Sequence, residues 1–275
     1  MAIELASIAD RLIAAQDAAT TLPPITAAMP DFSIADGYAV LAEIERRRRQ
    51  QGWRTVGRKI GFTNRATWPR YGDYQPNWAH LWANTVQFAP DRKASMALHR
   101  FVEPRIEPEV VFKLNAPVPL TDDPIEVLAA TEWIAPGFEI VQSHFPNWKF
   151  TAADTTAACA LHGALVVGAP VAVTDANRAK LAAALPAFLL TLRRGEDVID
   201  RGVGANVLDS PALALAHLAR LLADQSQFPA LAAGEIVTTG TLTDAWPVKP
   251  GEVWSSDYGA LGLAGLTLRF SGPAR

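Results

Sequence analysis

The sequence contains a single cysteine, Cys159, among 275 residues. One thiol cannot form an internal disulfide, so the class of small secreted proteins stapled by disulfides is excluded. No apolar run approaches the roughly 18 residues that a membrane-spanning helix needs. The N-terminal segment also lacks the basic head and apolar stretch of a secretory signal. We therefore expect a cytoplasmic protein with no membrane partner.

The sequence also lacks a large net charge. The formal net charge is −3, from 25 lysine and arginine residues against 28 aspartate and glutamate residues. Such a balance gives no basic field that would attract a nucleic acid, and we expect no nucleic-acid partner. The basic run Arg46–Arg49 closes a helical segment, where cations suit the carbonyl end, so we interpret it as a solvated helix end.

Several common catalytic signatures are missing. The five histidines and the cysteine show no HExxH or CxxC spacing, which removes the usual sequence support for zinc. There is no GxSxG elbow, no glycine loop of the phosphate-binding kind and no dinucleotide fingerprint. The chemistry of this chain must therefore be sought among its carboxylates and its lysines.

Hydrophobic residues make up 49% of the chain, which is ample for a large core. Helical periodicity over 3–20 and 34–50 predicts a small N-terminal helical lobe over residues 1–53. A β-rich domain should follow over 54–275, with helices predicted at 153–163 and 210–225. Its strand-like segments are 55–62, 85–88, 99–114, 133–141, 163–168, 187–195 and 234–242. Many strands with few helices favour an α+β fold with a barrel-like core.

Residues 105–112, RIEPEVVF, place two carboxylates in a segment that otherwise looks like a buried strand. Because side chains alternate along a strand, Glu107 and Glu109 share one face and repel each other unless a cation or protons lie between them. Glu139 is a third carboxylate in an apolar strand-like setting. Three oxygen ligands would select a hard ion such as Mg²⁺, Mn²⁺ or Ca²⁺ rather than zinc. On spacing alone, salt bridges to arginines, with Arg105 the nearest, are an equally good interpretation.

Lys59 is the other charged group in an apolar strand, within GRKIGFTN (57–64). The glycines on both sides would let a ligand or a backbone approach closely. The lysine could supply positive charge to an anionic substrate or act as an acid or base, and a lysine that snorkels from a strand edge is the alternative. Around Gly240, the segment GEIVTTGTL offers hydroxyl groups and amides that could bind a carboxylate.

Taken together, these segments resemble the fumarylacetoacetate hydrolase superfamily, specifically its branch of 2-keto-4-pentenoate hydratases and 4-oxalocrotonate decarboxylases. The matching pieces stand in family order: GRKIGFTN, IEPEVVF, FEIV with NWKFTAAD, GVGANVLDSPALALAHLARLLA, and GEIVTTGTL with a PGE turn. The resemblance implies a β-rich core of that family and a small-molecule 2-oxo acid as substrate. It also implies a Mg²⁺ or Mn²⁺ site made by Glu107, Glu109 and Glu139, a catalytic Lys59, and Thr239, Gly240 and Thr241 beside the substrate.

The activity that the resemblance implies is that of a hydro-lyase in the catabolism of aromatic compounds. It would add water to 2-hydroxy-2,4-dienoates of the 2-keto-4-pentenoate type and give 4-hydroxy-2-oxo acids, as a homo-oligomer. The closest alternative is a carboxy-lyase that decarboxylates 2-oxo-3-enedioates of the 4-oxalocrotonate type. Since a diacid needs a second cation, Arg70 and Arg105 are the positions that should separate the two. Cleavage of a C–C bond is a third reading, and a non-catalytic partner with a structural metal is a fourth.

Two departures from the family pattern bear on proton transfer. Gln75 precedes Pro76 where an acidic residue is usual, with Asp73 nearby, and Leu161 and His162 stand where small hydroxyl residues are usual. We therefore take Asp73 and His162, the latter on the helix predicted at 153–163, as candidates for the general acid or base. Asp154, near the start of the same helix, is a third candidate for this role and is placed beside the substrate.

Overall fold

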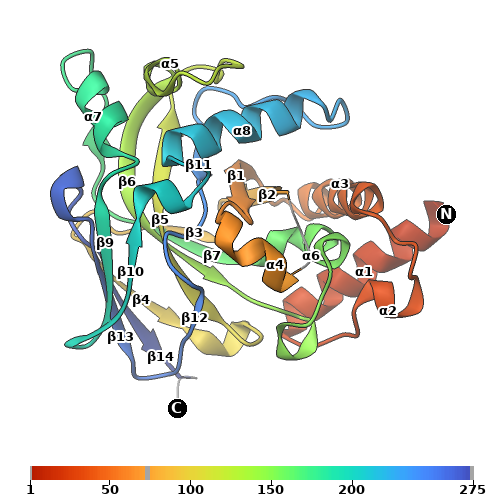
Figure 1. Cartoon of the computed structure of the whole chain (residues 1–275). Coiled ribbons are helices and arrows are strands. Elements are labelled where there is room, and N and C mark those ends of the chain that lie inside the picture. Colours follow the sequence, from red (N-terminus) through yellow and green to blue (C-terminus); the bar gives the residue numbers. More distant parts are fainter. Residues whose placement is uncertain (1, 72–74, 273–275) are drawn as a thin grey trace.

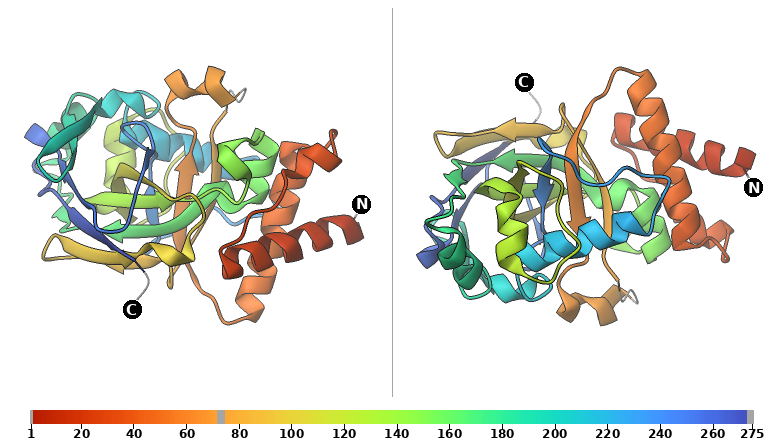
Figure 2. Two further views of the ribbon diagram at one scale, coloured as in Figure 1. Left: turned by 90° about the horizontal axis from the view of Figure 1, so that it is seen from below. Right: turned by 90° about the horizontal axis from the view of Figure 1, so that it is seen from above.

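The computed structural model describes residues 2–71 and 75–272, in which helices lie along one side and at one end of two β-sheets (Figure 1). The helices are α1 (Ala2–Ala18), α2 (Ile25–Ala28), α3 (Ile34–Gln50), α4 (Trp68–Tyr71), α5 (Pro124–Ala129), α6 (Ala152–Ala157), α7 (Arg178–Ala184) and α8 (Pro211–Ala223). Figure 2 shows α1, α2 and α3 grouped at one end of the molecule, with α7 at the other. Within these residues no helix combines the length and apolarity that crossing a membrane requires.

The first sheet has the strand order β2-β1-β11-β5-β6-β7-β3, with β12 beside β5 and β8 beside β6. Its strands are β1 (Thr55–Gly61), β2 (Asn77–Trp82), β3 (Val86–Phe88), β5 (Arg105–Leu114), β6 (Thr131–Val141), β7 (His162–Val167), β8 (Val171–Ala172), β11 (Ile236–Thr238) and β12 (Trp246–Pro247). Most neighbours are antiparallel, while the pairs β1–β11 and β3–β7 are parallel. The sheet curls into a half-barrel, which confirms the α+β, barrel-like core expected from the sequence.

The second sheet has the order β10-β9-β13-β14-β4. Its strands are β4 (Lys93–Ala97), β9 (Leu189–Arg194), β10 (Asp197–Val203), β13 (Val253–Asp257) and β14 (Thr267–Ser271). The strands β13 and β14 escaped the sequence analysis, as did β2, whose residues NWAHLW are all buried. A strand buried on both faces shows no polar alternation, so the period-two signal is lost.

α3 has the bounds that the sequence predicts, whereas α1 ends at Ala18 instead of residue 20 and the short α2 was not predicted. Ser33 caps α3 by accepting a hydrogen bond from the Asp36 backbone N–H, and Asp36 returns the contact in a capping box. The interpretation of Arg46–Arg49 as a solvated helix end is wrong for Arg48. Its side chain is only 2% exposed, because its guanidinium stacks over Trp53 and pairs with Asp17 of α1. The domain boundary predicted at residue 53 stays a prediction.

The helix predicted over 153–163 is shorter than expected. α6 ends at Ala157, and Cys159, Ala160 and Leu161 then follow with φ values of 55°, 47° and 64°. Three consecutive residues in the left-handed region cannot continue a right-handed helix. The chain therefore reverses here, and His162 lies at the start of β7 rather than on a helix.

Candidate active site and metal centre

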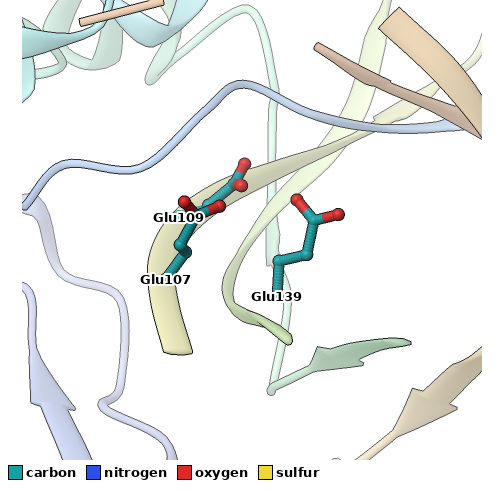
Figure 3. A group of neighbouring side chains, drawn as sticks. All are labelled: Glu107, Glu109 and Glu139. Carbon is teal, nitrogen blue, oxygen red and sulfur yellow. The ribbon is translucent and has the colours of Figure 1, made fainter. Parts of the chain in front are cut away.

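Three carboxylates meet where β5 and β6 pair. The antiparallel register sets Glu107 opposite Glu139 and Glu109 opposite Gly137, so all three side chains belong to one face of the sheet. One carboxylate oxygen from each glutamate lies within 4.8 Å of the others, and Figure 3 shows the three groups converging from two strands. Glu109 and Glu139 are fully buried, while Glu107 is partly exposed. This brings together the three predicted metal ligands.

The electrostatics of this cluster leave room for a cation. Burial raises the pKa of Glu109 well above its usual range, and burial raises that of Glu107 to about 7 against the opposing charge of Lys59. Burial acts in the same sense on Glu139, but the charge of Lys59 and a hydrogen bond from His162 outweigh it and lower that pKa to about 2. Glu109 Oε1 is buried and has no hydrogen-bond partner. Salt bridges alone therefore leave this oxygen unsatisfied, whereas a divalent ion would satisfy it.

Lys59, on β1, is buried beside this cluster and does not snorkel to solvent. Its Nζ lies 3.3 Å from Glu139 Oε2 and donates a hydrogen bond to the Ala160 carbonyl at 2.9 Å. Burial by itself would lower the pKa of Lys59, but the charges of the three glutamates reverse the direction and raise it. The lysine is thus a permanent positive charge next to three acids.

The glycine–threonine segment contacts the carboxylate cluster and also lines the pocket. The Gly240 N–H donates to Glu109 Oε2 at 2.7 Å, so this amide orients Glu109 rather than facing a substrate carboxylate. Gly240 has φ +99°, and a Cβ there would overlap Thr63 Oγ1, which leaves glycine as the residue that fits. Thr239 is buried and donates to the Val110 carbonyl, away from the pocket. Thr241 does line the pocket.

A pocket opens directly above Glu107 and Lys59. Phe62, Trp148 and Leu161 supply apolar wall to it. Arg105 lies at the same pocket, with its guanidinium carbon 3.9 Å from the centre of the Trp148 ring. The pocket therefore combines the carboxylate of Glu107, the buried cation of Lys59 and an apolar wall beside a second cation, Arg105.

Two other predicted site residues lie away from this pocket. Asp154 is fully buried and accepts hydrogen bonds from the backbone N–H and hydroxyl groups of Thr26 and Thr151, which ties α2 to α6. Placing it beside the substrate was wrong, because its oxygens are occupied by these structural contacts. His162 contacts Glu139 without lining the pocket. Asp73 falls outside the described residues.

Two polar residues near the site were not predicted from the sequence. Thr63 follows Lys59 in GRKIGFTN, lines the pocket and has a buried hydroxyl without a hydrogen-bond partner. Asn77 of β2 is buried, and its amide donates to the hydroxyl groups of Thr155 and Thr156. Thr63 could have been found from its position in the segment GRKIGFTN, which also contains Lys59. Asn77 could not have been found in this way, because strand β2 was itself not predicted.

Comparison with known proteins agrees with this geometry. The model of the fumarylacetoacetate (FAA) hydrolase C-terminal family matches residues 74–268, and the chain belongs to this family. The chain is 31% identical over 251 residues to a 4-oxalocrotonate decarboxylase of Pseudomonas sp. (strain CF600), covering 90% of each sequence. It is 32% identical over 246 residues to a 2-hydroxyhexa-2,4-dienoate hydratase of Comamonas testosteroni, covering 88% of this chain and 89% of the relative.

A solved structure extends the similarity to nearly the whole chain. The 4-oxalocrotonate decarboxylase from Pseudomonas putida G7, complexed with magnesium and adipate, superposes with a TM-score of 0.88 at 26% identity. The alignment covers 98% of both chains, including the N-terminal helices. The branch of the family indicated by the sequence segments is thereby confirmed.

Proposed function

We propose that this protein is a metal-dependent lyase of 2-oxo acids, and first of all a hydratase. It would add water to 2-hydroxy-2,4-dienoates and give 4-hydroxy-2-oxo acids, as in the breakdown of aromatic compounds. The observation that carries the proposal is the convergence of Glu107, Glu109 and Glu139 next to the buried charge of Lys59, with Glu107 and Lys59 lining a pocket. Relatives named as hydratases and decarboxylases, one of them complexed with magnesium, support the same reading.

The three carboxylates would hold Mg²⁺ or Mn²⁺, because their donors are all oxygen and Glu109 Oε1 has no other partner. When bound, such an ion supplies Lewis acidity that stabilises negative charge on the keto oxygen of a 2-oxo acid. Lys59 stays protonated and offsets part of the excess negative charge when an anionic substrate enters. The Gly240 amide keeps Glu109 oriented, and Thr241 borders the substrate.

The apolar side chains of the pocket wall would contact the carbon chain of the substrate. Phe62, Trp148 and Leu161 exclude water from the dienoate chain, so that only water directed at the reacting carbon would add. For that step, Asp73 stays the candidate acid or base. His162 is held between Glu139 and Thr85 and does not line the pocket, so we propose no direct proton transfer between His162 and the substrate.

A second candidate function is decarboxylation of a 2-oxo-3-enedioate, and Arg105 favours it. Its guanidinium lies at the pocket, stacked on Trp148, where it could receive the distal carboxylate of a diacid. Replacement of Arg105 by leucine would then raise KM for the diacid at least tenfold and leave a mono-acid dienoate unaffected. An equal effect on both substrates would rule out this role for Arg105.

A substrate panel tests the proposed function. The protein is incubated with 2-hydroxydienoates and 2-oxo-enedioates, with Mg²⁺ or with a chelator, while loss of the conjugated chromophore and release of CO₂ are followed. We expect metal-dependent loss of the chromophore, without CO₂ for a hydratase and with CO₂ for a decarboxylase. Turnover that persists in chelator, or no turnover of any panel member, would contradict the proposal.

Two further expectations belong to this proposal. We propose that the protein works in the cytoplasm and as a homo-oligomer.

The alternative of a non-catalytic partner requires further protein ligands that close the metal site. Among the described residues, no fourth His, Cys, Asp or Glu joins the three glutamates, and Glu107 lines the pocket, which favours an open site and an enzyme.

A further inference from the structure

His162 holds one oxygen of Glu139 while Lys59 faces the other. The Nδ1 atom of His162 lies 2.7 Å from Glu139 Oε1, and Lys59 Nζ lies 3.3 Å from Glu139 Oε2. Because an ionised carboxylate can only accept hydrogen bonds, Nδ1 is the ring nitrogen that carries the proton. This contact is fully buried, so water does not compete for the carboxylate oxygen.

The second ring nitrogen of His162 is held by Thr85. Nε2 lies 2.9 Å from Thr85 Oγ1, and the same hydroxyl donates to the Trp82 carbonyl at 3.0 Å. Thr85 is itself fixed in the turn between β2 and β3. Its backbone N–H donates to the Trp82 carbonyl at 2.9 Å, and its carbonyl accepts from the Leu165 N–H at 2.8 Å. The ring is therefore held in orientation at both nitrogens.

An irregularity in β7 turns His162 toward Glu139. Ile140 pairs with Ala164, but the next residue, Val141, pairs with His162, so Gly163 is an extra residue in the ladder. In a regular ladder Val141 would oppose Gly163, and His162 would point to the face opposite Glu139. The bulge reverses this and brings the imidazole to the carboxylate face. A Cβ at Gly163 would lie 2.6 Å from the Ile140 carbonyl oxygen, so the bulge requires glycine.

We propose that His162, oriented by Thr85, is a positioning residue that fixes the carboxylate of Glu139 for metal binding. The inference rests on the metal site of the proposed function. A ligand already held in its binding orientation loses less freedom when the ion arrives, and outer contacts of this kind are typically worth about 10-fold to 100-fold in metal affinity. The imidazole acts through Glu139 and touches neither the ion nor the substrate.

The test is Mn²⁺ binding to the full chain, measured by equilibrium dialysis. His162→Leu removes the donor at similar size and should weaken the affinity about 10-fold to 100-fold. His162→Asn keeps an amide N–H near the place of Nδ1 and should recover part of the loss. Thr85→Val removes the hydroxyl and should cause a smaller loss, whereas the matched control Thr85→Ser keeps the hydroxyl and should bind like wild type.

The outcomes separate this inference from the proposed function. If wild type binds Mn²⁺ but His162→Leu binds it equally well and only melts at a lower temperature, the role is structural and the positioning proposal is overturned. If His162→Leu does not fold, the pair Thr85→Val and Thr85→Ser decides, and equal affinities in that pair overturn it. A wild-type protein that binds no Mn²⁺ would overturn the metal site and this inference together.

Discussion

Glu107 of β5 and Glu139 of β6 lie directly opposite each other in an antiparallel pair of strands. Like charges at such a position normally destabilise a sheet, because the side chains are the nearest cross-strand neighbours. Glu109, which comes from the same strand as Glu107, is fully buried beside them, and burial raises its pKa well above the usual range. The protein without metal therefore carries a cost in stability that a bound divalent ion would remove.

Replacement of Glu107 by glutamine should expose this cost. In chelator, Glu107→Gln should raise the free energy of unfolding by about 1–2 kcal/mol, because a like charge opposite Glu139 is lost. The same variant should lose most of the thermal stabilisation that Mn²⁺ gives to wild type. Chemical denaturation in chelator and thermal melting with Mn²⁺ measure the two effects. A variant less stable than wild type in chelator would show that repulsion does not dominate at this position.

Lys59→Met should separate metal binding from catalysis. Loss of a positive charge 3.3 Å from Glu139 leaves the acidic cluster more negative, so Mn²⁺ should bind severalfold more tightly. Turnover should nevertheless fall by about 100-fold or more, since the buried charge that stabilises an anionic substrate is gone. Equilibrium dialysis measures the Mn²⁺ affinity, and steady-state kinetics with saturating metal measure kcat. The exposed Lys93→Met serves as control, and weaker Mn²⁺ binding together with unchanged kcat in Lys59→Met would refute both expectations.

Gly240 and Gly234 form a matched pair for a test of crowding at the site. Both have positive φ, +99° and +89°, but a Cβ at Gly240 would overlap Thr63 while nothing lies within 4 Å of one at Gly234. Each alanine variant should cost about 1–2 kcal/mol for the left-handed backbone. Gly240→Ala should cost clearly more, and should also weaken Mn²⁺ binding, because the hydrogen bond to Glu109 is displaced. Equal losses of unfolding free energy in the two variants would contradict this account.

The pH dependence of stability should reveal a further carboxylate, the half-buried Glu45 of α3. Burial acts to raise its pKa, but hydrogen bonds and charges from His80 and Arg49 prevail and lower it from 4.5 to about 2. A carboxyl group with a lowered pKa contributes stability above the unfolded pKa and loses it as the pH falls through the folded pKa. Glu45→Gln should therefore cost about 1–3 kcal/mol at pH 6 and nearly nothing at pH 2.

Urea denaturation across this pH range measures the difference between wild type and Glu45→Gln. The exposed Glu126 of α5 provides the control, since Glu126→Gln should leave the profile parallel to that of wild type. A constant difference between Glu45→Gln and wild type from pH 6 to pH 2 would mean that the ion pair does not explain the stability.

Local patterns in the sequence were enough to single out the carboxylates that come together in the structure. Glu107 and Glu109 share a face because side chains alternate along any strand, and this holds whatever the partner strand is. The caps of α3 and α8 were equally local, since Ser33 and Ser210 bond to backbone groups two or three residues away. Where the signal was not local, prediction failed, as with β2 and with the extent of the helix before His162.

What the sequence by itself determined is the set of charged groups that cannot be buried alone, namely Lys59 and the three glutamates in apolar strands. Only the tertiary structure decided which groups compensate them. Gly240 reaches Glu109 from 131 residues away, and His162 reaches Glu139 through one extra residue in a strand. Such contacts depend on strand register, and a shift of a single residue turns every side chain to the other face, so no short stretch of sequence encodes them.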